Sequence, residues 1–288
     1  MDRRRFLGAA LASAGVAPAL SRSVVGADVR QGAASAEVPF AARPGAADAA
    51  QIAGSVQMCV FDVFGTVVDW RSSVIAEVDQ LASDKGWELD AVEFAEAWRS
   101  NYGPSRNRVR TGELPWTKLD DLHRMTLDDL LVRYRLEGLT EAEKIHLNKV
   151  WHRLHPWPDS SEGLRRLKAR YVLSPLSNGN VALLTNMAKF GDLAWDCVLG
   201  SDVVRHYKPD REMYMMPSDF FDIPPSAVML VAAHTGDLES AQSHGLRTAF
   251  VHRPLERGPD RPPVPMPEEG RFDFLATSFV DLAEQLGL

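Results

Sequence analysis

Short apolar segments that alternate with helices are the feature that most constrains the fold of this chain. Residues 56–62 are apolar and β-branched and end in an aspartate and a glycine-containing turn, which is typical of a buried parallel strand. From residue 158 onward, strands and helices alternate, and this order predicts a doubly wound, mostly parallel α/β sheet. The further elements expected there are residues 171–176, 181–190, 197–200, 228–232, 238–244, 248–251 and 279–286.

A long helical segment separates the first strand from the rest of the predicted sheet. Between residues 70 and 154, apolar side chains recur at helical spacing. This segment interrupts the α/β pattern, so we expect it to form a separate cap. A proline-rich stretch over residues 254–267 is expected to be a surface loop. The predicted domains are an α/β core, residues 56–70 and 158–288, and a helical cap inserted after the first strand, residues 71–157.

The composition indicates a globular protein and argues against nucleic-acid binding. Hydrophobic residues make up 45% of the 288 residues and charged residues 25%, which is not the composition of a disordered chain. Because 39 acidic residues outnumber 32 basic ones and give a net charge of −7, the surface repels a phosphate backbone. The two cysteines, Cys59 and Cys197, are too few for a disulfide scaffold, although a single bridge between them is left open.

The N-terminus carries the pattern of an export signal. It contains, in order, Asp2-Arg3-Arg4-Arg5-Phe6-Leu7, a weakly apolar stretch over residues 8–20, and the small residues Val25-Gly26-Ala27. This order predicts that residues 1–27 are a twin-arginine (Tat) signal peptide, so that the Tat translocase exports the protein to the periplasm or cell envelope. The alternatives are a basic N-terminal helix and a membrane anchor, but the apolar stretch is shorter than the ~18 residues that span a bilayer. Residues 28–55 are expected to be a flexible linker.

Chemically distinctive residues follow four of the expected strands. In a doubly wound sheet, functional groups gather beyond the carboxyl ends of the strands. The four segments are Asp62-Val63-Phe64-Gly65-Thr66, Ser177-Asn178-Gly179-Asn180, Lys208-Pro209-Asp210 and Ala232-Ala233-His234-Thr235-Gly236-Asp237. Their order, with a helical insert between the first and the second, resembles the haloacid dehalogenase superfamily over nearly the whole of residues 56–288. The resemblance implies an α/β core with a helical cap.

Asp62 is the expected nucleophile. A carboxylate at the end of the first strand can form a covalent ester and so divide one difficult displacement into two easier steps. The alternative is an aspartate that only caps the following helix.

Two departures from the superfamily's phosphatases concern the leaving group and the metal. Those enzymes carry an acid two residues after the nucleophile, because an alkoxide must be protonated as it departs, and this chain has Phe64 there. They bind Mg²⁺ through an acidic residue four positions before the last aspartate, where this chain has Ala233. Both departures resemble the type II 2-haloacid dehalogenases, which need neither metal nor cofactor. A packing role for Phe64 in an altered phosphatase is the alternative.

The resemblance gives roles to three residues beside Asp62. Thr66 would orient the carboxylate, Lys208 would keep it ionised by its opposite charge, and Tyr214 would add a phenolic hydroxyl to the pocket. The structural alternatives are a helix cap for Thr66, a solvated charge for Lys208 and a core aromatic for Tyr214.

Substrate binding is expected from the second segment and from the cap. Ser177 and Asn178 would hold a substrate carboxylate at a strand-to-helix turn, unless they only form a turn that Asn180 caps. Arg99 resembles the arginine that receives the departing halide, since a permanently charged guanidinium suits a developing anion. Its alternative is an exposed helical arginine. Trp98 and Tyr102, its neighbours, either wall the pocket or pack the cap.

The fourth segment differs from many type II dehalogenases, which have Ser-Ser-Asn where this chain has Ala232-Ala233-His234. His234 either helps to position or deprotonate the hydrolytic water or is a structural histidine. Asp237 either activates that water or holds Lys208, unless it only stabilises the start of a helix.

The expected reaction is the hydrolytic dehalogenation of small 2-haloacids to 2-hydroxy acids through an aspartyl ester. Two alternatives stay open: a Mg²⁺-dependent phosphatase of the same superfamily, and a non-catalytic envelope protein that binds small acids. No cofactor is expected, and the resemblance also implies a possible homodimer.

Overall fold

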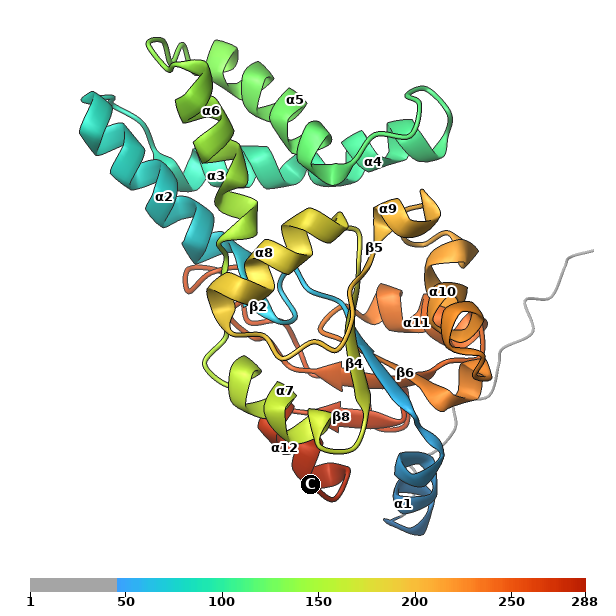
Figure 1. The fold of residues 1–288 in the computed structure, drawn as a ribbon. Coiled ribbons are helices and arrows are strands. Elements are labelled where there is room, and N and C mark those ends of the chain that lie inside the picture. The colour runs from blue at the N-terminus through green and yellow to red at the C-terminus, as the bar shows by residue number, and fades with distance from the viewer. Residues whose placement is uncertain (1–45) are drawn as a thin grey trace, which may run out of the picture. The chain divides into compact units, whose positions relative to one another are not determined.

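The computed structural model describes residues 46–288, whose arrangement Figure 1 shows. The expected signal peptide, residues 1–27, and residues 28–45 of the expected linker lie outside the described residues. In the part of the chain that is described, no helix combines the length and the apolar character that a membrane crossing requires.

A six-stranded sheet forms the core, in the order β5-β4-β1-β6-β7-β8 (Figure 1). All of its neighbouring strands are parallel. The strands are β1 Met58–Phe61, β4 Val172–Ser177, β5 Leu199–Gly200, β6 Val228–Ala232, β7 Arg247–Val251 and β8 Phe274–Ala276. The first strand thus lies between β4 and β6, and the predicted parallel α/β sheet is confirmed. The short edge strand β8 is absent from the prediction.

Strand β1 is buried on both faces, which is why its sequence is apolar without alternation. Cys59 and Phe61 belong to one hydrophobic cluster, whereas Met58 and Val60 belong to another. Among the helices after β3, α7 Ser160–Lys168, α8 Val181–Gly191 and α12 Phe279–Gln285 contribute to the first cluster, and α10 Arg211–Phe221 and α11 Thr235–Ser243 contribute to the second. The short helices α9 Ser201–Val204 and η2 Pro225–Ala227 complete the core.

Helices fill the segment between β1 and β4, as predicted. Strands β2 Val68–Asp69 and β3 His155–Pro156 pair antiparallel and connect this segment to the core. The helices between them are α2 Trp70–Lys85, α3 Ala91–Ser100, α4 Tyr102–Arg110, α5 Leu119–Arg133, α6 Glu141–Asn148 and η1 Lys149–His152. Asp69 caps α2, since its side chain accepts a hydrogen bond from the Ser72 amide. The cap of this helix is therefore neither Asp62 nor Thr66.

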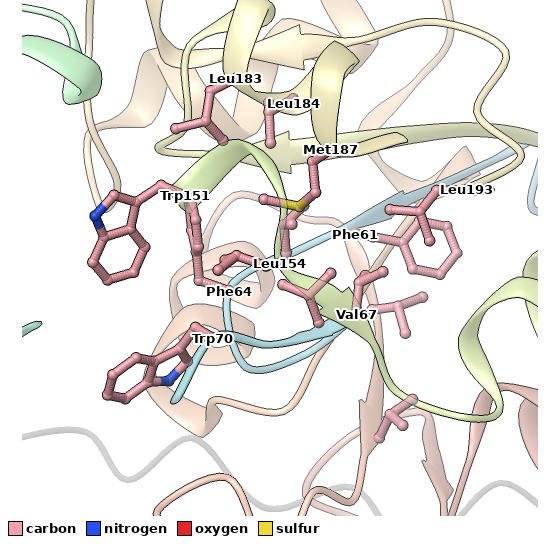
Figure 2. Packing of buried hydrophobic residues seen from close by; sticks show 14 of the residues in the cluster. Phe61, Phe64, Val67, Trp70, Trp151, Leu154, Leu183, Leu184, Met187 and Leu193 are labelled. Carbon is pink, nitrogen blue, oxygen red and sulfur yellow. The ribbon is translucent and has the colours of Figure 1, made fainter. Parts of the chain in front are cut away.

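Aromatic rings pack where the helical insert meets the core. Figure 2 shows Phe64, from the loop after β1, close to Trp70 and Trp151 of the insert. The ring centroids of Phe64 and Trp151 are 6.2 Å apart, and Trp70 stacks on Trp151 at 6.4 Å. All three side chains are buried. The position two residues after Asp62 is therefore held by apolar packing.

Residues 46–55 differ from the expected flexible linker, because they form helix α1, Ala46–Ser55. Ile52 and Ala53 are buried in the hydrophobic core, and the Tyr171 hydroxyl donates to the Ala53 carbonyl at 3.1 Å. Alanine is the strongest helix former, so an Ala-rich stretch with one apolar anchor becomes a packed helix. The linker prediction is wrong for these ten residues.

The two cysteines are free thiols in this structure. Cys59 is fully buried in β1, and burial raises the pKa of its thiol above the usual range. The bridge to Cys197 that the sequence leaves open is not formed.

A buried ion pair fixes the loop that carries Thr66. The guanidinium of Arg253, which follows β7, donates to both carboxylate oxygens of Asp159, at 2.7 and 3.0 Å. Its Nε also donates to the Thr66 carbonyl at 2.8 Å, and Asp159 accepts from the Phe279 amide. Arg253 therefore connects the loop after β1 to the start of α7 and to α12.

Replacing Arg253 with methionine should lower the free energy of unfolding by about 3 kcal/mol, because the change leaves the buried Asp159 carboxylate without its partner. Urea denaturation measures this loss. The matched control is Arg165→Met, which removes an exposed pair with Asp192 and should cost no more than about 1 kcal/mol. Equal losses in the two variants would contradict a structural role for the buried pair.

Candidate active site

A cavity of about 360 Å³ lies at the carboxyl ends of β1, β4 and β6. Helices α3 and α4 of the insert supply part of its wall. Its lining residues are Asp62, Phe64, Arg99, Tyr102, Arg106, Asn178, Lys208, Pro209, Tyr214, His234, Gly236, Asp237 and Ser240. The cavity thus joins residues from all four segments that the sequence singles out.

Asp62 leaves the central strand with its carboxylate anchored on one side. Its Oδ2 accepts hydrogen bonds from the Thr66 hydroxyl at 2.8 Å and from His234 Nδ1 at 2.9 Å. Its Oδ1 has a longer contact, 3.5 Å, with Lys208 Nζ. Burial by itself raises the pKa of Asp62, but the Lys208 charge, the His234 bond and charge, and the Thr66 bond together hold that pKa below its usual range. The carboxylate is therefore ionised in the resting protein.

Thr66 fixes the direction of the Asp62 carboxylate. Its hydroxyl accepts a hydrogen bond from the Ala233 amide at 3.0 Å and donates its own proton to Asp62 Oδ2. A hydroxyl has only one proton to donate, so the bond from Ala233 decides which way it points. The loop after β6 thereby orients the residue at the end of β1.

Lys208 and Asp237 form a buried pair beneath the cavity. Their Nζ and Oδ2 atoms are 2.6 Å apart, and the side chains are 7% and 10% exposed. Burial lowers the pKa of Lys208, but the charges of Asp237 and Asp62 outweigh it and raise that pKa, so the ammonium stays charged. Tyr214 donates its hydroxyl proton to Asp237 Oδ1 at 2.7 Å. Of the two roles considered for Asp237, holding Lys208 is the contact that the structure contains.

Burial is also the largest influence on Asp237. It raises the pKa of this carboxyl above the usual value, and the nearby negative charge of Asp62 adds to the rise, against the lowering effect of Lys208. Asp237 is consequently a stronger base than an ordinary surface carboxylate.

Glu256 belongs to the site, although sequence reasoning missed it. His234 Nε2 lies 2.9 Å from Glu256 Oε1, while His234 Nδ1 faces Asp62. The proline-rich segment is an irregular and mostly exposed loop, as predicted, but the Glu256 side chain is only 12% exposed. A usable signal exists, since Glu256 follows β7 and so lies beyond the same edge of the sheet as the other site residues.

The two carboxylates set the charge of His234. Burial lowers the pKa of the imidazole, but hydrogen bonds to Asp62 and Glu256 and their charges raise it to about 10. At neutral pH His234 is thus an imidazolium that donates from both nitrogens. This charge argues against a role as the base that deprotonates water in the resting protein.

Gly65 allows Glu256 to approach. Its φ of +85° lies in the left-handed region that favours glycine. A Cβ atom at this position would also collide with the Glu256 carboxylate.

The side chains of Ser177 and Asn178 lie in different environments. Ser177 is fully buried, its hydroxyl accepts from the Gly179 amide at 3.2 Å, and it does not line the cavity. Asn178 lines the cavity, and its Oδ1 accepts from the Lys208 amide at 2.8 Å. Asn180 makes no cap bond to α8 with its side chain and instead donates to Asp120 of the insert. Because Ser177 closes a turn inside the core, it cannot contact a ligand in this arrangement.

Arg99 is enclosed by aromatic rings. Its guanidinium carbon lies 4.0, 5.2 and 5.9 Å from the ring centroids of Tyr102, Trp70 and Phe64. Its Nη1 is buried and has no hydrogen-bond partner among the described residues. Arg99 is therefore not the exposed arginine of the alternative interpretation, and a buried N–H without a partner can receive an anion.

The two neighbours of Arg99 have different positions. Tyr102 lines the cavity. Trp98 is buried and donates its ring N–H to the His123 carbonyl at 3.0 Å, so it packs the insert.

The chain is similar to several haloacid dehalogenases. The chain is similar to the (S)-2-haloacid dehalogenase 4A of Burkholderia cepacia, with 29% identity over 69% of this chain and 84% of that protein. It is also similar to the crystal structure of a defluorinating L-2-haloacid dehalogenase, with 43% identity over 81% of this chain and 96% of the other, and a TM-score of 0.77. A second L-2-haloacid dehalogenase structure shares 44% identity over 80% and 99% of the two chains, with a TM-score of 0.75.

A protein-family model, haloacid dehalogenase-like hydrolase, matches residues 56–245. This range runs from the segment before β1 to the end of the loop after α11, and it contains Asp62, Lys208 and Asp237. The chain belongs to the haloacid dehalogenase-like hydrolase family.

Proposed function

We propose that this protein hydrolyses the carbon–halogen bond of small 2-haloacids and releases 2-hydroxy acids through an ester on Asp62. One observation carries the proposal: an ionised, anchored carboxylate and an enclosed arginine with a free N–H line the same cavity, and Phe64 occupies the position of a proton donor. A halide leaves as a stable anion and needs no proton. The names of the similar proteins support the same substrate class and the (S) enantiomer.

The first step uses the free oxygen of Asp62. Oδ2 is occupied by Thr66 and His234, so Oδ1 is the oxygen available for attack. It forms a bond to the substrate α-carbon while the carbon–halogen bond breaks, and the bonding electron pair leaves with the halide. Arg99 then holds the halide ion by charge and by its free N–H.

The second step hydrolyses the ester at the carboxyl carbon of Asp62. Oδ2 is then the ester carbonyl oxygen, and Thr66 and His234 are already in place to donate to the negative charge that develops on it. Because His234 is charged, its donation is stronger than that of a neutral group. His234 thus stabilises the oxyanion and does not abstract the proton.

The pair of Lys208 and Asp237 completes the proton balance. Asp237, with its raised pKa, accepts a proton from the attacking water. Lys208, bonded to Asp237 and 3.5 Å from Asp62 Oδ1, gives a proton to that oxygen as it leaves with the 2-hydroxy acid. Proton transfer from Asp237 to Lys208 then restores both groups, and the Asp62 carboxyl, whose pKa is lowered, releases the second proton of the water to solvent.

We also propose that the reaction needs no metal ion. Phe64 and Ala233 replace two parts of the superfamily's phosphatase site. Among residues 46–288, no group of three or more His, Cys, Asp or Glu side chains is arranged to hold a metal ion. The Lys208 ammonium lies beside both Asp62 and Asp237 and supplies the positive charge there.

The chelator-treated protein should release halide from chloroacetate and from one enantiomer of 2-chloropropionate. Fluoroacetate is a further substrate to assay, because one similar protein is described as defluorinating.

Asp62→Asn should reduce halide release at least about a thousandfold, as expected for loss of a nucleophile. The matched control, Asp192→Asn, alters an exposed carboxylate and should leave the rate unchanged. One turnover in ¹⁸O-labelled water should place the label in the Asp62 peptide.

Three outcomes would reject this proposal. Activity that returns only with Mg²⁺ and acts on a phosphoester indicates the phosphatase alternative. Stabilisation by haloacids without any product indicates the binding-protein alternative. An unlabelled Asp62 peptide after turnover rejects the aspartyl ester.

The charge of His234 has a measurable pH dependence. Its pKa is raised from 6.5 to about 10, so its ion pairs stabilise the fold fully below pH 6.5 and are lost as the pH rises through 10. The stability difference between wild type and His234→Asn should therefore shrink from neutral pH to pH 10, as measured by urea denaturation. The hydrolysis rate of the wild type should fall over the same alkaline range, and the variant should lack this fall.

An exposed histidine provides the control for this measurement. His146→Asn changes a ring that is 69% exposed and lies outside the cavity, and it should leave the alkaline fall in the hydrolysis rate unaltered. An acidic limb in the wild-type rate that disappears in His234→Asn would instead identify His234 as the base.

We further propose that residues 1–27 direct export by the Tat translocase to the periplasm or cell envelope, and that the protein forms a homodimer, as the resemblance implies. The export proposal is supported by the order of the arginine pair, apolar stretch and small residues. Replacing both Arg3 and Arg4 with lysine should keep the protein in the cytoplasmic fraction, whereas Arg5→Lys, outside the pair, should not. Equal fractionation of the two variants would contradict the proposal.

A further inference from the structure

A second guanidinium lines the cavity and has no role in the steps described so far. Arg106, on α4, packs over the Tyr102 ring at 4.2 Å, and its Nη1 donates to the Lys208 carbonyl at 2.9 Å. Its Nε is buried and has no hydrogen-bond partner within residues 46–288. The edge formed by Nε and Nη2 is the one with which an arginine binds a carboxylate through two parallel hydrogen bonds.

The charges of the cavity leave two cations unpaired. Lys208 is paired with Asp237, and His234 is shared by Asp62 and Glu256. Arg99 and Arg106 have no carboxylate within ion-pair distance in the described chain. The cavity-lining groups, together with Glu256 behind His234, thus comprise four cations and three carboxylates, and a monoanionic ligand would balance them.

The proposed reaction generates a need for two separate cations. A 2-haloacid carries one negative charge on its carboxylate, and attack by Asp62 moves a second negative charge onto the departing halide. Arg99 has three aromatic rings around it, which suits a small, weakly hydrated ion. Arg106 lies beside the polar backbone of Lys208 and offers a planar edge.

The two residues that the sequence predicts to bind the substrate carboxylate, Ser177 and Asn178, supply no charged group to it. Ser177 is turned into the core, and Asn178, whose Oδ1 accepts from the Lys208 amide, has only the uncharged Nδ2 group to donate to a carboxylate. We infer that Arg106 binds the substrate carboxylate and is the residue that selects 2-haloacids over neutral organohalides. The inference rests on the proposed function, since it names the acid-recognising group of that same cavity.

Kinetics on the active protein give the first test. Arg106→Met should raise the KM for chloroacetate about 10- to 100-fold, as expected for the loss of charged hydrogen bonds, and should change kcat far less. The KM for chloroacetamide, which has no charge to lose, should be unaffected. Arg106→Lys, which keeps the charge without the planar edge, should give an intermediate KM and verifies that the fold tolerates changes at this position.

A latch between insert and core is the competing role for Arg106, and α4 offers a matched control. Arg110, one turn further along, forms an ion pair with Asp210 at 2.8 Å and does not line the cavity. Arg110→Met should leave the KM for chloroacetate unchanged. An equal rise in KM in the Arg106→Met and Arg110→Met variants would overturn the inference, because it would show that both residues act through docking of the insert.

Binding without turnover distinguishes this inference from the proposed function. In the Asp62→Asn background, calorimetry should show that Arg106→Met loses propionate binding and keeps bromide binding, and that Arg99→Met does the reverse. Propionate binding that survives Arg106→Met overturns the inference even if dehalogenation is observed. If no organohalide is turned over but propionate binding depends on Arg106, the proposed function fails, and of the inference only the binding of a carboxylate by Arg106 stands.

Discussion

The anchoring of one carboxylate oxygen at the end of the central strand is the interaction on which the rest of the site depends. Thr66 and His234 both donate to Asp62 Oδ2, and each is held in turn, Thr66 by the Ala233 amide and His234 by Glu256. The same two donors serve both halves of the proposed reaction: they expose Oδ1 for attack and then face the ester carbonyl. No donor needs to move between the steps, which is the meaning of preorganisation in such a site.

Different segments of the chain supply the charged side chains around the Asp62 carboxylate. In the proposed reaction, Lys208, which contacts Oδ1, and its partner Asp237 transfer protons, whereas Arg99 and Arg106 of the helical insert bind anions. Because the guanidiniums belong to a segment that contacts the core through aromatic packing and a few polar bonds, the proposal assigns substrate recognition and nucleophilic chemistry to different parts of the chain. Changes in the insert can therefore alter selectivity while the core keeps its chemistry.

The sequence predicts the parallel sheet and most of the cavity because both follow from chain order. Strand exits converge at one edge, so Asp62 and the segment with Asp237 come together if the strands are assigned correctly, whereas Lys208 follows helix α9, eight residues after the end of β5. Ser177 could not be placed, since one residue of register decides whether a side chain at a strand end faces the cavity or the core. Glu256 can be anticipated only as a residue beyond the exit of β7, because its exact position depends on an irregular loop. Arg106 could not be predicted, because its position depends on how the insert packs. Helix α1 was missed because an alanine-rich composition suits a tether as well as a helix.

The charge of His234 also depends on Gly65, a residue without a side chain. The space left by its absent side chain is where the Glu256 carboxylate sits, and without that carboxylate His234 would face a single anion. The affinity of the imidazole for its second proton is thus set in part by a hydrogen atom in place of a methyl group, at a residue four positions beyond the end of β1. Divergence among related proteins at this one backbone position would change the acid–base chemistry of a histidine that it does not touch.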